Sequence, residues 1–307
     1  MNIQLVCEPD GDAVTLDACL HFSLLRERYQ PFSVLRARFA VPSAAMTPPQ
    51  HIALKLDGQT VHAGLVQQAE IRQEGGLTLL DVCAKGYGAA LIRNQLEPGN
   101  YYQATLQSLL STYTLPGVTG ESGTAAVNYI HVDERQPLWE GVIAYAYKLA
   151  YAYPYVRVPN LVCVSPQTSQ TAVTISPAAV LASGSGIHTA ELISRVDMAD
   201  LDGQYGTFTL DNPEAAARGI VSVQTMRMDQ QFLYSPPDAM QFRISRSGRG
   251  LRYDSFTYAG YCGEDIEDAV CCGTLSGRVS RILISGSAAG VVTEDRIYYD
   301  DFCNVQA

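Results

Sequence analysis

The sequence lacks a long apolar run, a basic leader and an excess of basic side chains. No stretch of eighteen consecutive apolar residues occurs, so we expect no transmembrane segment. The N-terminal text MNIQLVCEPDGDAV has no basic segment followed by an apolar one, so we expect no secretory signal and a protein that is soluble where it is made. The formal net charge of -10 opposes binding to phosphate backbones, which relies on clustered Lys and Arg, so we expect no sequence-specific nucleic-acid binding.

Recognisable catalytic motifs are also missing. The five histidines, at positions 21, 51, 62, 131 and 188, show no HxH, HExxH or HxxxH spacing, which removes the usual ligands of a catalytic metal. GESGTAA at 120–126 lacks one residue of the GxSxG elbow, and SGSG at 183–186 is not followed by the Lys of a phosphate loop. We therefore predict no catalytic residue, no cofactor and no metal. His131 lies two residues before Asp133, and a pocket lined by both would favour an enzyme instead.

The eight cysteines do not show the spacing of a structural zinc site. Cys271 and Cys272 are adjacent, whereas structural zinc sites use CxxC pairs, and no histidine lies within thirty residues of them. Because no export signal is expected, we interpret the cysteines as reduced thiols.

Acidic residues cluster toward the C-terminal end of the sequence. We interpret them as solvated charges in short β turns and at the chain end, where they keep strand edges from pairing wrongly. The alternatives are the paired carboxylates of a glycosidase or a cation site, although the DxDxDG spacing of a calcium loop is absent. The residues concerned are Glu264, Asp265, Glu267, Asp268, Glu294, Asp295, Asp300 and Asp301.

Two regions of the chain show the period-two alternation of antiparallel strands. From residue 13 to residue 85 the strands are separated by turn signals, of which Asp57-Gly58 and Gly75-Gly76 are the strongest. We predict a first tube-like β-barrel domain over 1–87, because a meander of five or six strands must curl to hide its edges. From AELISRVDMAD to TEDRIYYDDF, including AMQFRISRS, the alternation returns, and we predict a second such domain over 190–307.

The segment between the two β regions has helical spacing. GYGAALIRNQ and NYYQATLQSLLSTY are predicted as short helices, and QPLWEGVIAYAYKLAY at 136–151 is the strongest helix signal, followed by a buried strand in PYVRVPNLVCVSP. We predict an α+β insertion domain over 88–165 and a Ser/Thr/Gly-rich connector over 166–189. The predicted fold class is therefore mostly β, with two antiparallel tail-tube-like barrels and a smaller helix-bearing domain.

The order of these elements resembles the baseplate hub family of contractile phage tails, the late control protein D family, and the hub half of type VI secretion spike proteins. The residues that carry the resemblance are PFSVLRARF, GLTLLDVCAKGYGAALIRNQLEP with the helix NYYQATLQSLLSTY, the aromatic helix before PYVRVPN, and GRVSRILISGSAAGVVTEDRIYY. The resemblance implies a structural subunit and no enzyme. Three copies would form a pseudo-six-fold ring between the tail tube and the central spike.

The resemblance also implies the partners and the location. These are a homotrimer, a tail-tube or tube-initiator protein, the tape-measure protein, baseplate wedge proteins, and a spike expected as a separate polypeptide because no spike module follows the last strand. The protein would be made in the bacterial host cytoplasm and would end in the tail baseplate of a virion or related particle.

Eighteen tyrosines suit a protein with large subunit interfaces, since their rings bury while their hydroxyls reach a partner. The alternative is a soluble carbohydrate-binding or adhesion module that uses tyrosines as aromatic platforms. The predicted interface residues are Arg36, Arg38, Tyr145, Tyr147, Arg243, Arg246, Tyr298 and Tyr299.

Overall fold

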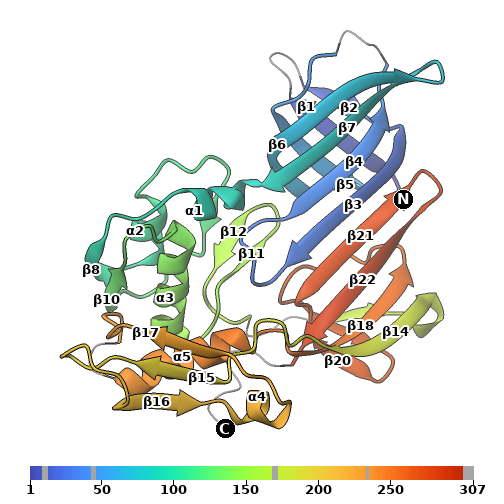
Figure 1. The fold of residues 1–307 in the computed structure, drawn as a ribbon. Coiled ribbons are helices and arrows are strands. Elements are labelled where there is room, and N and C mark those ends of the chain that lie inside the picture. The colour runs from blue at the N-terminus through green and yellow to red at the C-terminus, as the bar shows by residue number, and fades with distance from the viewer. Residues whose placement is uncertain (9–12, 43–45, 168–171, 233–234, 300–307) are drawn as a thin grey trace.

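The computed structural model describes residues 1–8, 13–42, 46–167, 172–232 and 235–299 (Figure 1). Its largest element is an antiparallel sheet of eleven strands, curled so that β1, β2 and β5 lie behind β4, β6 and β7. From edge to edge the order is β14 (Val180–Ile187), β18 (Arg252–Ala259), β22 (Gly290–Tyr298), β21 (Arg281–Ser287), β3 (Cys19–Glu27), β4 (Val34–Ala40), β7 (Leu77–Gly86), β6 (Gln59–Glu74), β5 (His51–Leu56), β1 (Ile3–Glu8) and β2 (Val14–Leu16).

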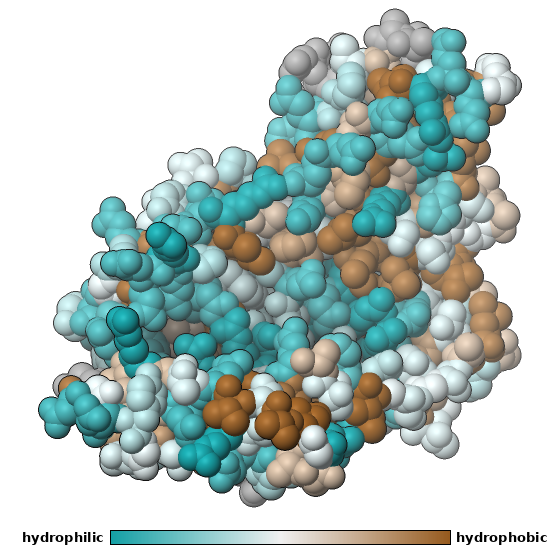
Figure 2. Space-filling view, viewed as in Figure 1, coloured by the Kyte–Doolittle hydropathy of each residue, from teal (hydrophilic) through white to brown (hydrophobic). Residues whose placement is uncertain are grey.

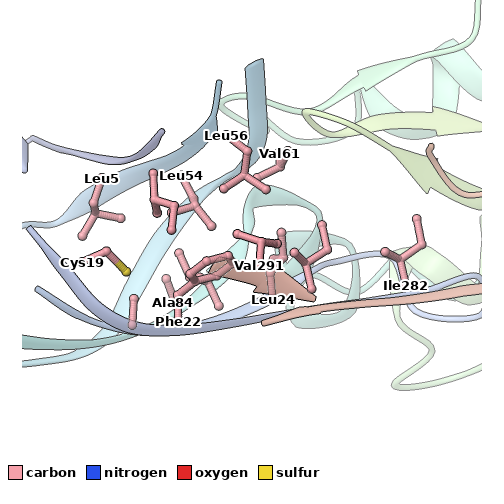
Figure 3. Close-up of a cluster of buried hydrophobic side chains, with 14 of the residues drawn as sticks. Leu5, Cys19, Phe22, Leu24, Leu54, Leu56, Val61, Ala84, Ile282 and Val291 are labelled. Atoms are coloured by element: carbon pink, nitrogen blue, oxygen red, sulfur yellow. The ribbon is translucent and has the colours of Figure 1, made fainter. Parts of the chain in front are cut away.

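This sheet joins the two β regions that the sequence separates. Strand β21 pairs with β3 from Arg281 opposite Glu27 to Gly286 opposite Phe22, so each strand satisfies backbone groups that would otherwise form an open edge. The buried side chains of both regions share one core, in which Val291 of β22 lies near Phe22 and Leu24 of β3 (Figure 3). The two separate barrels predicted over 1–87 and 190–307 are therefore corrected to one open, curled sheet.

The turn signals in the first β region are confirmed. Asp57 and Gly58 both adopt positive φ between β5 and β6, and Gly75 and Gly76 do the same between β6 and β7. The long strand β6 also pairs closely with β7. A Cβ on Gly64 would lie 2.1 Å from the carbonyl oxygen of Lys85, so only glycine permits this approach.

The helix-bearing part lies beside the sheet and has its own core. Helix α3 confirms the prediction at 136–151, and its buried face includes Leu138, Val142 and Tyr145. The prediction of a helix over NYYQATLQSLLSTY is confirmed for its second half, which contains α2, and is wrong for its first half, which forms β8. The buried strand predicted in PYVRVPNLVCVSP is a hairpin of β11 and β12. The elements are η1 (Tyr87–Ala89), α1 (Ala90–Arg93), β8 (Gly99–Ala104), α2 (Leu106–Leu110), β9 (Thr119–Gly120), β10 (Val127–Val132), α3 (Leu138–Ala150), β11 (Tyr155–Arg157) and β12 (Leu161–Cys163).

Residues 190–251 form a small α/β unit and do not continue the β meander. Strand β15 (Arg195–Met198) pairs with β16 (Phe208–Asp211) and β17 (Val223–Met226), and two helices accompany them, α4 (Pro213–Ala217) and α5 (Pro236–Ser247). The prediction of a strand in AMQFRISRS is wrong. Two prolines occupy the first turn of α5, and Ala239 and Met240 are buried with Ile244 packed against the same cluster, which is a helical face.

The predicted connector over 166–189 is more structured than its composition suggests. Its short strand β13 (Val173–Ile175) pairs with β19 (Ala269–Cys272), which in turn pairs with β20 (Leu275–Arg278). The turn η2 (Pro177–Ala179) then leads into β14, which forms one edge of the large sheet. No helix among the described residues is both long and apolar enough to span a membrane.

Candidate interaction surfaces

Three of the predicted interface residues make contacts inside the chain. Tyr145 is fully buried on α3, and its hydroxyl donates to the carbonyl oxygen of Ala125 over 2.6 Å. Tyr147 packs edge-on against Phe242 of α5, with ring centroids 4.8 Å apart. Arg246 of α5 donates two hydrogen bonds of 2.5 and 2.6 Å to Glu140 of α3. Tyr147 and Arg246 therefore join α3 to α5 within one subunit.

Two further predicted residues have partners on the sheet. Arg38 donates to Asp81 over 2.6 Å across β4 and β7. The hydroxyl of Tyr298 donates to Glu27 over 3.1 Å. The remaining three predicted residues are more accessible: Arg36 on β4, Arg243 on α5, and Tyr299, whose hydroxyl also donates to Asp254. The structure does not bring the eight residues together: Tyr145 is buried, and the exposed ones lie on separate elements.

Sequence reasoning missed the exposed apolar side chains. Val221 and Leu201 of the α/β unit are 89% and 82% exposed, and Leu181 and Ile187 project from the edge strand β14. Figure 2 shows hydrophobic side chains gathered over the α/β unit, and others over the large sheet. Strand β14 carries no charge and no proline, the residues that usually protect an edge from pairing with another chain. These features are typical of surfaces that meet a partner.

The acidic cluster at 264–268 is buried, which corrects its interpretation as solvated charge. Asp265 pairs with Arg26 of β3, and Glu267 pairs with Arg28 over 2.7 Å. Asp268 pairs over 2.7 Å with Arg157, which lies on β11 of the helix-bearing part. The sequence distance between these acids and their arginines, from about one hundred to 240 residues, left no local signal for the pairing. The cluster fastens the helix-bearing part to the large sheet.

A second pair of buried acids lies beside this cluster. Glu264 accepts a hydrogen bond of 2.6 Å from the hydroxyl of Tyr258, whereas neither carboxyl oxygen of Asp295 has a hydrogen-bond partner among the described residues. Burial raises the pKa of both groups, and the charge of Glu264 raises that of Asp295 further. Both carboxyls are therefore easier to protonate than exposed carboxyls. Asp300 and Asp301 lie outside the described residues.

A cleft between α3 and the α/β unit contains the predicted His131–Asp133 pair. Its volume is about 270 Å³. His131 Nδ1 lies 2.8 Å from the amide oxygen of Asn100, and its Nε2 lies 3.5 Å from Asp133. The described residues that line the cleft include no Ser, Thr, Cys, Tyr or Lys, so they offer no hydroxyl, thiol or amine nucleophile. Of the other two carboxylates that line the cleft, Glu140 is neutralised by Arg246, and Asp229 accepts hydrogen bonds from the backbone N–H groups of Gln231 and Phe232. The cleft thus supplies an oriented imidazole and a binding surface.

No metal site is formed by the part of the chain that the structure describes. Groups of three or more His, Cys, Asp or Glu side chains with metal-binding geometry are absent there. Cys271 and Cys272 lie on β19 and are free thiols, as are the other described cysteines.

Comparison with solved structures identifies the fold. A tail protein from Neisseria meningitidis superposes with a TM-score of 0.72 over 98% of this chain and 97% of its own, at 12% sequence identity. The chain has a phage tail protein fold. The 43 kDa tail protein of prophage MuSo2 from Shewanella oneidensis gives a TM-score of 0.67 at 13% identity, covering 97% of this chain and 98% of its own.

The fold also occurs in a secretion system. The E. coli c3393 protein, a type VI secretion component similar to the phage T4 tail proteins gp27 and gp5, superposes with a TM-score of 0.55 at 10% identity over 93% of this chain and 74% of its own. No family model matches the sequence, and no curated protein matches it. At these sequence identities the similarity is one of fold. This fold agrees with the resemblance to tail hub proteins seen in the sequence and with the predicted mostly β fold class.

Proposed function

We propose that this protein is a structural hub subunit of a contractile phage tail or a phage-derived injection particle. The observation that carries the proposal is the end-to-end superposition on two phage tail proteins, which leaves no large part of this chain unmatched. The sequence and the fold therefore point to the same class of protein by separate routes.

In this proposal three copies form a ring with pseudo-six-fold symmetry. This arrangement is supported by the two halves of the large sheet, which meet where β3 pairs with β21. Strands from residues 1–86 lie on one side of that junction and strands from residues 180–298 on the other, so that each subunit presents two β regions side by side. Three subunits would present six such regions around a channel, and a six-fold tube could then be joined to a three-fold spike.

The partners follow from that position. The ring would meet the tail tube or its initiator on one side and a separate central spike on the other, with the tape-measure protein in the channel and wedge proteins outside. The exposed apolar residues of the α/β unit and the unprotected edge of β14 offer surfaces for such permanent contacts. The location would be the tail baseplate of the particle, after synthesis in the host cytoplasm.

We propose that the role is mechanical and not catalytic. The proposal is supported by the lack of a hydroxyl, thiol or amine nucleophile among the described residues of the His131–Asp133 cleft and by the use of Asp265, Glu267 and Asp268 in ion pairs. The exposed residues Arg36, Arg243 and Tyr299 remain predicted interface residues.

The proposal is tested by the assembly that the purified protein forms. Sedimentation at several concentrations should yield a species of three times the 33.3 kDa chain mass, and co-expression with a spike protein from the same particle should yield a complex of both. A monomer that binds glycans on an array would instead support the adhesion module and overturn the hub.

A further inference from the structure

A pocket of about 390 Å³ lies where the large sheet meets the end of α5 and the segment that follows β14. Its walls come from five strands, β3, β14, β18, β21 and β22, and from three loops that are far apart in the sequence. The volume lies within the range of natural small-ligand sites. The proposed hub role does not require this pocket.

Tyrosine rings form its rigid walls. The ring of Tyr298 stacks on that of Tyr29 with centroids 5.8 Å apart and an interplanar angle of 12°, and Tyr253 meets Tyr298 edge-on. Gly250, at φ +64°, lies so close that a Cβ there would stand 3.3 Å from the Tyr298 ring. The aromatic faces are thus fixed in position before any ligand enters.

Three arginines provide the positive charge, and each is held in place. Arg249 lies 5.0 Å above the ring of Tyr29, and Arg296 lies 4.6 Å above the ring of Tyr253. Arg281 donates to Glu294 over 2.8 Å. All three side chains are less than one-third exposed, so their guanidinium groups lose little freedom on binding a ligand.

The protonation of Glu27 sets the net charge of the pocket. Ionised Glu27, Glu191 and Glu294 would balance the three arginines. Burial raises the pKa of Glu27 to about 7, although the Tyr298 hydroxyl and the charges of Arg281, Arg296 and Arg249 oppose the rise. Below pH 7 the pocket therefore carries one uncompensated positive charge.

We propose that this pocket binds a carboxylate, with the guanidinium groups of Arg281 and Arg296 as its partners and the tyrosine rings against its carbon skeleton. A single excess positive charge suits a monoanion better than a doubly charged phosphate. The planar guanidinium fork also matches the two oxygens of a carboxylate. The ligand is either an acidic side chain of a partner protein or a free aromatic acid, and binding is coupled to proton uptake by Glu27. His188, which also lines the pocket, lies in the loop after β14.

Calorimetric titration of the full chain at pH 6 and pH 8 tests the proposal. The probes are benzoate and the peptide acetyl-Glu-Tyr-Glu-amide, with acetyl-Gln-Tyr-Gln-amide as the uncharged control. At least one acidic probe should bind saturably at pH 6, and about 10-fold more weakly at pH 8, following the fraction of Glu27 that is protonated. Glu27→Gln, which mimics the protonated form, should keep the pH 6 affinity and lose the pH dependence.

Two matched arginine variants separate the pocket from general electrostatics. Arg296→Gln should weaken binding at least 10-fold, whereas Arg218→Gln should leave it unchanged. Both arginines pair with a glutamate, at 2.8 and 2.6 Å, and both side chains are 29% exposed. Tighter binding of the peptide identifies a partner segment as the ligand, and tighter binding of benzoate identifies a free acid.

Three results would overturn the proposal. The first is that neither acidic probe binds saturably at concentrations up to about 10 mM. The others are equal affinities of the two arginine variants for the probe and a pH dependence of binding that persists in Glu27→Gln. Circular dichroism of each variant shows whether it is folded. If Arg296→Gln is not, the Glu27→Gln titration decides alone.

Discussion

Removing the carboxylate of Asp265 tests how the helix-bearing part is fastened to the sheet. This carboxylate accepts from the guanidinium of Arg26, from the backbone N–H of Val158 over 2.9 Å, and from the N–H of Ile266 over 2.5 Å. In Asp265→Ala the guanidinium of Arg26, whose side chain is only 5% exposed, stays buried without its counter-ion. We expect a loss of about 3 to 5 kcal/mol in the free energy of unfolding, the usual cost of an uncompensated buried charge.

Urea denaturation measures this loss with two probes. Trp139, the single tryptophan, is buried on α3 and reports on the helix-bearing part by fluorescence, while far-ultraviolet circular dichroism is dominated by the sheet. In the wild-type protein the two transitions should coincide. In Asp265→Ala both midpoints should fall, and the fluorescence transition should come first because the linkage to β11 is weakened.

The matched control is Asp133→Ala, which removes a carboxylate whose side chain is 76% exposed and should change stability by less than about 0.5 kcal/mol. The double variant Arg26→Met/Asp265→Leu should recover part of the loss, since apolar residues of similar size replace the buried pair at little net cost, while the N–H groups of Val158 and Ile266 still lack their acceptor. A loss below about 1 kcal/mol in Asp265→Ala, or no recovery in the double variant, would refute the reasoning.

Three further predictions concern other parts of the fold. Asp295→Asn should stabilise the protein by about 1 to 3 kcal/mol at pH 8 and by less at lower pH, because folding raises the pKa of this carboxyl and the resulting cost grows as the pH rises from the unfolded-state pKa toward the folded-state pKa; urea denaturation across this pH range checks it. Arg246→Ala should cost about 1 to 3 kcal/mol by leaving Glu140 without its bidentate partner, and limited proteolysis should show faster cleavage within the α/β unit. Gly88→Ala should lower the melting temperature, at a cost of about 3 kcal/mol, because its Cβ would lie 1.8 Å from the carbonyl oxygen of Pro31; calorimetry measures it.

Local features of the fold could be predicted because neighbouring residues determine them. Asp57-Gly58 requires positive φ at both turn positions, and the structure has it there. The apolar face of α3 recurs at helical spacing and is buried as expected. The same local reasoning failed for residues 239–247, whose alternation suits a strand, although the two prolines that precede them and the packing of Met240 produce a helix.

Long-range features could not be read from the chain. Nothing near Glu27 or Arg281 indicates that β3 and β21 will pair, and this pairing decides whether the β regions form two barrels or one sheet. The burial of Asp265, Glu267 and Asp268 has no local sign in the sequence, because their arginine partners lie on other elements. For the same reason Tyr145 was predicted at an interface, although its hydroxyl finds a carbonyl oxygen inside the subunit.

Electron microscopy of the purified full chain tests the hub role most directly. The account predicts three-fold rings, in which six β regions, two from each subunit, surround a central channel. The hub role would be contradicted by isolated globular particles with the mass of one 33.3 kDa chain, seen at concentrations where a permanent trimer would persist.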